Sequence, residues 1–335
     1  MAASMQDVAE KAGVSRATVS RVLSNHPSVT AATRKNVLNW VEKLGYEPNL
    51  IAQRLAGNST SLIGVMVPEI AYPFFSEIIE AIENQAFYEG YNVIICNTRR
   101  NLEKERNILT ELKQRKADGI IAVPVSVEQS AASYRRVNLP VTMITKRMEG
   151  FHSVFINHYD GGVQMAKHFL NVGFQKMGYI GPISKSISAR KYAGFREYLL
   201  ANQATVADVI ECDPPENMNA TQVYENVKKY AAVHGIQSEV FFSNYDITAC
   251  EAMAALTDLG YSIPRDIALA GFDNSLLAKE ATPKLTSLAQ PLEEIGKKAV
   301  EVLLGQIRQK TEPQLYELET RVVARASTIN WKLPR

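Results

Sequence analysis

Two arginines near the start of the chain stand at a spacing that suits the reading of DNA bases. If VSRATVSRVL (14–23) is helical, one arc of the helix carries four residues: Arg16, Ala17, Ser20 and Arg21. The opposite arc is apolar and can pack against neighbouring helices. Arginine pairs with guanine through two hydrogen bonds, and small neighbours let a helix approach the base edges closely. The polar arc is therefore a candidate DNA-reading surface, although a solvated helix face is the commoner reason for such charges.

The elements around this segment set its orientation. Residues 5–12 place apolar side chains at helical spacing, and another helical pattern covers about 31–44. Gly13 permits a tight turn between the first two helices. A helix, a turn and a second helix with an outward polar face form helix-turn-helix architecture, whose second helix enters the major groove. The hydroxyls of Ser20 and Thr33 are candidates for phosphate contacts beside the bases.

The hydrophobic pattern of the sequence changes after a short linker. Residues 46–60 (YEPNLIAQRLAGNST) contain loop formers and predict a linker. From 61 to 335, short apolar runs alternate with amphipathic helical stretches, which predicts βαβ units and parallel sheets buried on both faces. We predict a small all-α helix-turn-helix head (1–45) and an α/β body of two doubly wound subdomains, with the main crossover near 145–160. The tail from Leu285 onward is expected to cross back to the first subdomain.

The apolar runs give the expected strands of the body: 62–68, 92–97, 119–125, 141–145, 153–157, 176–182, 206–211, 239–244 and 266–272. Helical patterns fall between most of them: 74–89, 102–116, 161–172, 190–201, 221–232 and 246–259. This alternation is typical of open parallel sheets covered by helices.

Charge and cysteine content narrow the class of protein. The chain of 335 residues carries a net charge of +2, whereas its first 58 residues hold seven Lys/Arg and four Asp/Glu. A small basic head on a near-neutral body points weakly to a polyanionic partner. The three cysteines are widely spaced and are expected to be reduced thiols. With no signal-like or membrane-spanning run, we expect a cytoplasmic, nucleoid-associated protein without membrane contact.

The motifs of common α/β enzymes are absent from the sequence. No strand is followed by GxGxxG, and there is no GxxxxGK[ST], HExxH or GxSxG. The five histidines show no metal-ligand spacing. We therefore expect no catalytic residue, no cofactor and no metal, and a DNA-binding protein rather than an enzyme.

A long run of motifs carries a resemblance to a known family. MQDVAEKAGVSRATVSRVL and EKLGYEPNLIAQRLAG stand in the head and linker, and PFFSEIIEAIE, GYIGP, IPRDIALAGFDN and LTSLAQP continue through the body. Together they resemble the lactose/galactose repressor (LacI/GalR) family of bacterial transcription regulators. The resemblance implies a repressor of carbohydrate-catabolism genes whose operator affinity is changed by a small carbohydrate effector. It also implies a body similar to type I periplasmic sugar-binding proteins.

For the DNA, the resemblance implies that Arg16, Ala17 and Arg21 read the major groove. Arg21 is expected to contact a guanine, while Ala17 either touches a thymine methyl or only provides clearance. The resemblance places Leu55 as an apolar wedge in the minor groove at a central CG step, unless it merely packs on its partner hinge. Two hinges side by side require a homodimer and a pseudo-palindromic operator. A dimer is also expected because no leucine heptad follows the last strand.

For the effector, the resemblance implies a site between the two subdomains, at the carboxyl ends of the strands. The candidates are Tyr72, Phe74, Phe75, Lys146, Arg147, Asp160, Lys191, Tyr245 and Asp273. Lys185 and Asp246 follow strands in the same way. Lys191 stands where the family has an arginine, which puts its role in doubt. Asp273 matches a family aspartate that accepts hydrogen bonds from the ligand, with a structural cap as the alternative.

The chemistry of the effector stays open at the level of sequence. Phe74 and Phe75 could stack on a sugar ring. Five cations favour an anionic ligand such as a sugar acid or sugar phosphate, unless they point into solvent: Lys146, Arg147, Lys185, Arg190 and Lys191. Alternatives to an induced repressor are an activator or a corepressor-dependent regulator of the same family. A solute-binding protein and an α/β enzyme fit the sequence less well.

Overall fold

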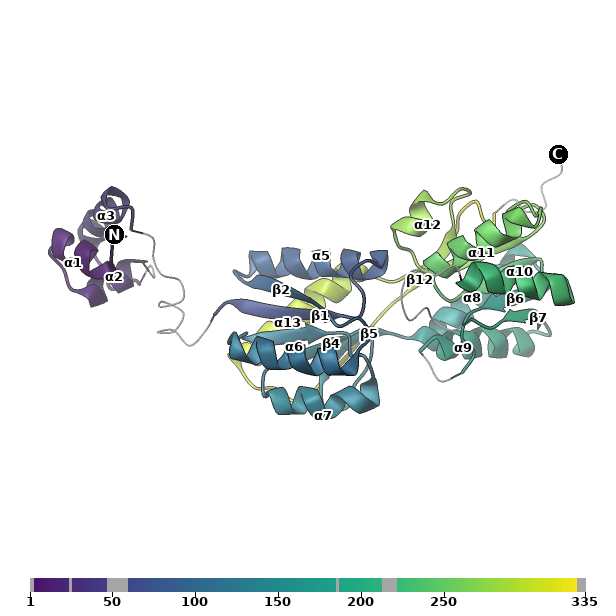
Figure 1. The fold of residues 1–335 in the computed structure, drawn as a ribbon, viewed down its shortest axis with the longest axis horizontal. Helices are drawn as coiled ribbons and strands as arrows, with labels where there is room; N and C mark the ends of the chain where they lie inside the picture. Colours follow the sequence, from purple (N-terminus) through teal and green to yellow (C-terminus); the bar gives the residue numbers. More distant parts are fainter. Residues whose placement is uncertain (1–2, 24–25, 47–59, 185–186, 213–221, 330–335) are drawn as a thin grey trace. The chain divides into compact units, whose positions relative to one another are not determined.

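The computed structural model describes residues 3–23, 26–46, 60–184, 187–212 and 222–329. The chain forms two compact units, Met1–Ser61 and Leu62–Arg335, which are called here the head and the body. The predicted hinge lies almost wholly outside the described residues, and so does Leu55. Figure 1 shows both units as ribbons.

The head consists of three helices: α1 (Met5–Ala12), α2 (Arg16–Leu23) and α3 (Ala31–Lys43). Ser4 and Asp7 form a capping box at the start of α1, and Gly13 ends it in the left-handed conformation. The helices bury valines from all three elements against one another, chiefly Val8, Val19 and Val37. The helix-turn-helix pattern predicted from sequence is confirmed.

The first lobe of the body is built on a parallel sheet of order β11-β5-β4-β3-β1-β2. Its strands are β1 (Leu62–Val67), β2 (Asn92–Asn97), β3 (Gly119–Ala122), β4 (Val141–Ile144), β5 (His152–Ile156) and β11 (Leu315–Leu318). Its helices are α5 (Pro73–Tyr88), α6 (Leu102–Gln114), α7 (Val127–Val137) and α13 (Leu292–Arg308). Helices α5 and α13 pack together, as do α6 and α7, so that the sheet is covered on both faces (Figure 1).

The second lobe repeats this plan with the order β12-β10-β9-β8-β6-β7, in which only β12 is antiparallel to its neighbour. Its strands are β6 (Lys176–Ile180), β7 (Thr205–Ile210), β8 (Val240–Ser243), β9 (Ala268–Asp273), β10 (Thr286–Ala289) and β12 (Arg321–Val323). Its helices are α8 (His158–Val172), α9 (Ile187–Ala201), α10 (Gln222–His234), α11 (Asp246–Asp258) and α12 (Leu276–Glu280). Two sheets covered by helices agree with the predicted fold class.

The chain passes between the lobes at three places: from β5 to α8, from β10 to α13, and from β11 to β12. The prediction that the tail returns to the first subdomain is confirmed, because Leu315–Leu318 pairs with Ser153–Ile156. Helix α7 was absent from the predicted elements. Ser126 caps it by accepting from the backbone N–H of Gln129, and Tyr134 and Val137 are its large apolar anchors.

Among the described residues, no helix is both long and apolar enough to cross a membrane.

Candidate DNA-reading and effector-binding sites

Helix α2 presents the predicted reading residues on its outer face. Arg16, Ala17 and Arg21 are exposed, whereas Val19 and Val22 are buried beneath them. The helix begins where the Ser15 hydroxyl accepts from the backbone N–H of Thr18, 3.1 Å away. The geometry leaves two arginines and one methyl group on a single exposed surface.

Side chains of α3 hold the ends of the two preceding helices. The guanidinium of Arg34 donates to the carbonyls of Val22 (3.3 Å) and His26 (2.9 Å), and Asn36 donates to the carbonyl of Ala12 (2.9 Å). The carbonyls of Ala12 and Val22 stand at helix C-termini, where the last carbonyls lack partners within the helix, so the contacts help to fix the angle between the helices. Thr33 accompanies Thr30 in the N-cap of α3, where its N–H and hydroxyl bond the Thr30 hydroxyl.

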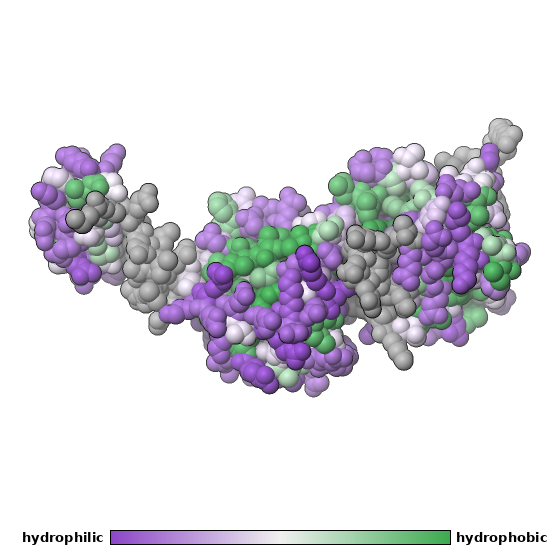
Figure 2. Space-filling view, viewed as in Figure 1, coloured by the Kyte–Doolittle hydropathy of each residue, from purple (hydrophilic) through white to green (hydrophobic). Residues whose placement is uncertain are grey.

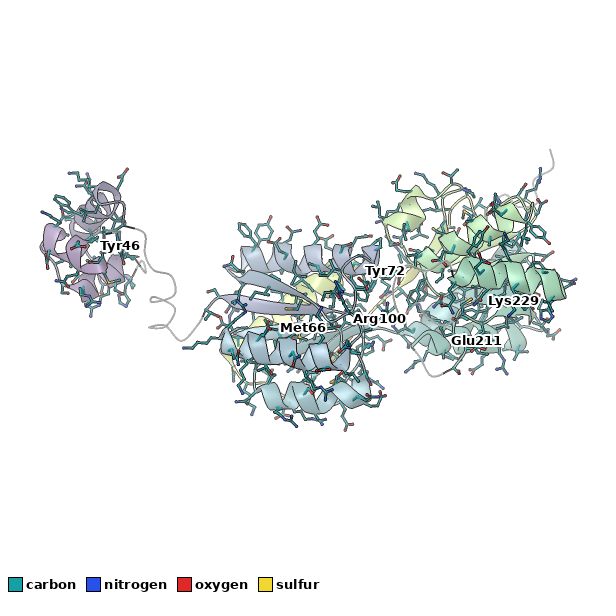
Figure 3. The ribbon with its side chains drawn as sticks, in the orientation of Figure 1. Tyr46, Met66, Tyr72, Arg100, Glu211 and Lys229 are labelled. Atoms are coloured by element: carbon teal, nitrogen blue, oxygen red, sulfur yellow. The ribbon has the colours of Figure 1, made fainter. Side chains whose placement is uncertain are left out.

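In the body, the two lobes meet at a hydrogen bond between Tyr72 and Asp273. Tyr72 precedes α5 in the first lobe and is labelled in Figure 3, whereas Asp273 ends β9 in the second lobe. The Tyr72 hydroxyl donates to Oδ2 of Asp273, and Gln290 Nε2 donates to Oδ1 at 2.7 Å. Both partners are almost completely buried. Burial raises the pKa of Asp273 to about 6, and burial together with Asp273 raises that of Tyr72 well above its usual value.

Lys191 lies fully buried beside this pair. Its Nζ donates to the carbonyl of Asn244 at 2.7 Å and lies 3.5 Å from the ring centroid of Phe272 and 4.1 Å from that of Tyr245. Burial lowers its pKa to about 7, while Asp273 and then Asp246 favour its charged form. Two aromatic faces and a carboxylate therefore balance one ammonium group inside the protein.

Close packing of α8 against α9 determines how deeply Lys191 is buried. Helices α8 and α9 cross so tightly that a Cβ added to Gly162 would lie 2.0 Å from the Lys191 carbonyl oxygen. A Cβ added to Gly194 would lie 2.0 Å from the carbonyl oxygen of Tyr159. Only glycine permits this approach of the two backbones. The crossing brings the start of α9, and with it the lysine, under the carboxyl end of the second sheet.

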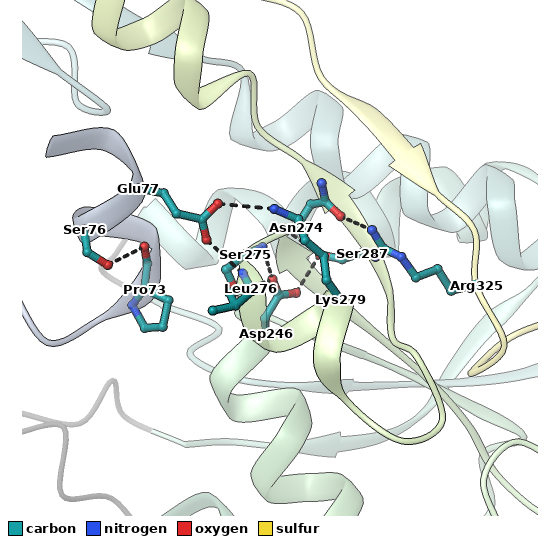
Figure 4. Close-up of polar contacts among 10 residues, drawn as sticks. All are labelled: Pro73, Ser76, Glu77, Asp246, Asn274, Ser275, Leu276, Lys279, Ser287 and Arg325. Atoms are coloured by element: carbon teal, nitrogen blue, oxygen red, sulfur yellow. Dashed lines mark hydrogen bonds and ion pairs between the residues drawn. The ribbon is translucent and has the colours of Figure 1, made fainter. Parts of the chain in front are cut away.

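A second carboxylate, Asp246, ties together the loops of the second lobe. It accepts from the N–H (2.8 Å) and hydroxyl (2.9 Å) of Ser275 and from the hydroxyl of Ser287 (2.6 Å), as Figure 4 shows. Burial and the nearby Asp273 raise its pKa to about 7. Asp273 itself has φ of 115°, a costly conformation for a residue other than glycine. The adjoining Asn274 is held by Arg325 and Ser287, so this turn is fixed from outside.

A clamp joins the lobes at the edge of the site. Glu77 of α5 accepts from the backbone N–H of Leu276 (2.8 Å) and from Lys279 Nζ (3.3 Å), both on α12 (Figure 4). The carboxylate lies at the N-terminus of α12, where unpaired N–H groups favour negative charge. Tyr72 and Glu77 thus connect one end of α5 to the second lobe through hydrogen bonds.

Family models recognise both units of the chain. Residues 4–49 match the family described as bacterial regulatory proteins of the lacI family, and residues 166–328 match a periplasmic binding protein-like domain. The chain is 32% identical to the HTH-type transcriptional repressor PurR of Photobacterium profundum, over 97% of this chain and 98% of that protein. The chain belongs to the lacI family of bacterial regulatory proteins.

Two further similarities agree with this assignment. The ribose operon repressor of Halalkalibacterium halodurans is 31% identical over 97% of this chain and 96% of its own length. The crystal structure of the lac repressor dimer bound to operator and the anti-inducer ONPF superposes with a TM-score of 0.86 at 28% identity, covering 98% of this chain and 99% of that one. This lacI-family chain is therefore a transcriptional regulator of the repressor class with a ligand-binding body, and not an enzyme.

The structure brings together only part of the predicted effector set. Tyr72, Lys191, Tyr245 and Asp273 contact one another. Phe74 and Phe75 are buried. Phe75 packs edge-on against Tyr72 and Phe74, and Phe74 lies tilted against Tyr72, so both rings support the tyrosine ring instead of forming an open sugar platform.

The other candidates have partners elsewhere. Lys146 donates to the carbonyls of Pro124 (2.7 Å) and Val125 (3.2 Å), and Asp160 accepts from Gln164 (2.6 Å). Arg147 is exposed. Lys185 lies outside the described residues. The cluster of cations that favoured an anionic effector is therefore not assembled in the described part of the chain.

Three members of the site were missed at the level of sequence: His158, Phe272 and Gln290. The ring of His158 stacks on Phe272 with centroids 5.7 Å apart, and Gln290 supports Asp273. His158 and Phe272 follow or end predicted strands, which was the signal that selected Tyr245 and Asp273, whereas Gln290 follows β10, which was not among the predicted strands. From sequence alone, the pair His152 and His158 is more typical of polar lining of the cleft than of metal ligands.

Proposed function

We propose that this lacI-family repressor binds a pseudo-palindromic operator as a homodimer, and that a small carbohydrate effector changes its affinity for that operator. The effector occupies the meeting point of the lobes, in contact with Tyr72, Lys191, Tyr245 and Asp273. The observation that carries the proposal is the hydrogen bond from Tyr72 to Asp273, since it joins the two lobes inside the proposed site.

The mechanism follows from where these groups are anchored. A sugar hydroxyl that donates to Asp273 competes with the Tyr72 hydroxyl, and a larger ligand requires the lobes to adjust. Because the carboxylate belongs to the second lobe and the tyrosine to the first, ligand binding favours one arrangement of the lobes over another. The head then binds operator with a different affinity in each arrangement.

The charges of the site favour a neutral effector. Lys191 is already balanced by Asp273 and Asp246, and Lys146 is engaged with backbone carbonyls. An added carboxylate or phosphate would have to face two buried aspartates. A neutral polyhydroxylated ligand instead supplies donors to the carboxylates and an apolar ring face to the aromatic side chains.

On the DNA side, we propose that Arg16, Ala17 and Arg21 read base edges while Ser20 and Thr33 contact the phosphates. We further propose that Leu55, within a hinge at 46–60, enters the minor groove at a central CG step. For the dimer, we propose the face formed by α5 and the edge strand β2. Figure 2 shows a hydrophobic area over these elements, where Phe87 is 71% and Ile95 46% exposed.

An operator mobility-shift assay tests the proposal. The DNA is a library with randomised half-sites, and each selected operator is retested with neutral pentoses and hexoses, with their sugar acids and with their phosphates. We expect palindromic sites with a central CG and a response to a neutral sugar. Lower affinity for operator would show induction, and higher affinity would show corepression. Asymmetric sites, or a response confined to sugar phosphates, would contradict the respective part of the proposal.

A further inference from the structure

Two side chains of the site bury polar atoms that have no hydrogen-bond partner. His158, the first residue of α8, and Gln290, just after β10, are each 8% exposed. Among the described residues, neither ring nitrogen of His158 nor the Oε1 atom of Gln290 has a partner at hydrogen-bond distance and angle, although the nearby backbone of Thr145 favours the charged form of the imidazole. Buried polar groups are nearly always paired, so an exception indicates a position that another molecule fills.

Both side chains border the same carboxylate. Gln290 Nε2 donates to Asp273 Oδ1 at 2.7 Å. His158 stacks at 24° on Phe272, the residue next to Asp273, and the ammonium group of Lys191 lies 3.5 Å from the centroid of that same ring. The unpaired atoms therefore belong to the cluster that joins the lobes.

The protonation of these groups defines what they can bind. Burial, with a further contribution from Lys191, lowers the pKa of His158 to about 3, so its imidazole is neutral. A neutral imidazole offers one N–H donor and one acceptor nitrogen. In Gln290 the amide nitrogen is committed to Asp273, so its oxygen remains as an acceptor. This set of one donor and two acceptors suits hydroxyl groups, which can both donate and accept.

We propose that His158 and Gln290 each bind a hydroxyl group of the effector, and that this lacI-family protein thereby selects a neutral sugar over its deoxy analogue. The proposal rests on the carbohydrate site proposed above and adds the residues that set its specificity. A site built to bind a hydroxyl rejects the analogue that lacks it, because the buried protein groups then stay unpaired. Neither group carries a charge that would attract an acid or a phosphate.

The test compares each sugar with its deoxy form. Calorimetry on the full chain uses D-ribose, D-xylose, D-glucose and D-galactose, and then the available deoxy forms of whichever sugar binds. We expect the wild type to bind the sugar at least about tenfold more tightly than one deoxy form. In His158→Phe, which keeps a ring against Phe272, the sugar should bind about tenfold more weakly and the preference over that deoxy form should fall toward one. In Gln290→Met the sugar should also bind about tenfold more weakly, and the preference over a deoxy form that lacks a different hydroxyl should fall toward one.

Two further measurements separate specificity from folding. His234→Phe, at an exposed histidine whose ring lies tilted against Tyr230, is the matched control and should bind as the wild type does. Because His158→Phe removes two unpaired buried atoms, its thermal midpoint without sugar should be equal to or above that of the wild type. If no neutral sugar bound the wild type, the carbohydrate site and this inference would both be overturned. If a sugar bound and His158→Phe and Gln290→Met kept the full preference over every deoxy form, only this inference would be lost.

Discussion

The hydroxyl of Tyr72 and the carboxylate of Asp273 form a buried hydrogen bond between residues that stand 201 positions apart in the chain. One belongs to the start of a helix in the first lobe, and the other to the end of a strand in the second. Each is supported by its own lobe: Phe74 and Phe75 pack on the tyrosine ring, and Gln290 holds the carboxylate. The bond is therefore sensitive to any change in how the lobes meet.

Substitution of Tyr72 by phenylalanine tests this bond directly. The ring contacts remain, but the buried carboxylate loses one of its two hydrogen-bond donors. We expect the free energy of unfolding to fall by about 1–3 kcal/mol and the sugar concentration for half-maximal operator response to shift. Chemical denaturation and operator titration measure the two effects. Tyr261→Phe, at a partly exposed tyrosine of the second lobe outside both the site and the proposed dimer face, is the control and should change neither. Equal behaviour of Tyr72→Phe and the wild type would show that the lobes are not coupled through this bond.

Substitution of Arg21 by alanine tests the proposed base contact. We expect operator affinity to fall by about 1–3 kcal/mol, which is roughly five- to 150-fold, and discrimination to relax at one base pair of each half-site. Loss of a phosphate contact would instead weaken binding to all sequences alike. Arg265→Ala, at an exposed arginine of the second lobe, should bind as the wild type does. A uniform loss across a library of operator variants would assign Arg21 to the phosphate backbone.

The buried charges predict how stability depends on pH. The pKa of Lys191 is lowered to about 7 from 10.5, so between these values the unfolded chain holds a proton that the folded chain has released. Stability from this group therefore rises as pH increases above 7. Asp273 and Asp246 have raised pKa values of about 6 and 7, so their contribution is greatest at low pH and falls as pH rises from about 4 to 7.

Denaturant unfolding of wild type and Lys191→Met between pH 7 and 9.5 measures the contribution of this lysine. The rise should be smaller in Lys191→Met, where Lys146, with a pKa lowered to about 8, still contributes, so that the difference between wild type and variant changes by up to about 1.4 kcal/mol per pH unit. Lys229→Met, at an exposed lysine, should follow the wild type at every pH. A constant difference between Lys191→Met and the wild type would mean that the ammonium group keeps its proton in the folded chain.

Two glycine substitutions test the tight crossing of α8 and α9. A Cβ at Gly162 would lie 2.0 Å from the Lys191 carbonyl oxygen and 2.8 Å from the Phe195 nitrogen, so the two backbones must separate. We expect Gly162→Ala to lower the free energy of unfolding by about 3 kcal/mol and to weaken sugar binding through displacement of Lys191. In Gly305→Ala, on α13, the added methyl meets nothing within 4 Å and should raise stability by about 0.5–1 kcal/mol. Equal effects of the two changes would refute the close approach.

The sequence alone predicted the elements well where their pattern was periodic. The head follows from its apolar stripe, its glycine and its caps, which are local signals. Helix α7 was missed because its apolar face is short. In addition, its buried Ser130 and Tyr134 donate hydrogen bonds from their hydroxyls to the carboxylate of Glu105, which lies 25 and 29 positions earlier in the sequence. Such a pairing leaves no local periodicity to detect.

For the candidate site, the sequence indicates which loops lie together, but not which contacts the side chains make. Position after a strand identified Tyr72 and Asp273, because the carboxyl ends of parallel strands always meet at one edge. It could not show that Lys146 turns to the carbonyls of Pro124 and Val125, or that Lys191 lies under two rings. Those outcomes depend on burial and on partners from other elements, which spacing does not encode.

The order of the strands has a consequence for synthesis of the protein. The first sheet ends in β11, and α13 covers one of its faces, yet both are made after nearly the whole second lobe. While the ribosome translates residues 157–291, the edge of β5 and the surface that α13 will cover are still without partners. Because the chain is synthesised from its N-terminus, the first lobe therefore stays incomplete until the segment with α13 and β11, within about the last fifty residues, has been made. Stalling or truncation in that interval would release an aggregation-prone five-stranded sheet with an open edge and one uncovered face, not a functional first lobe.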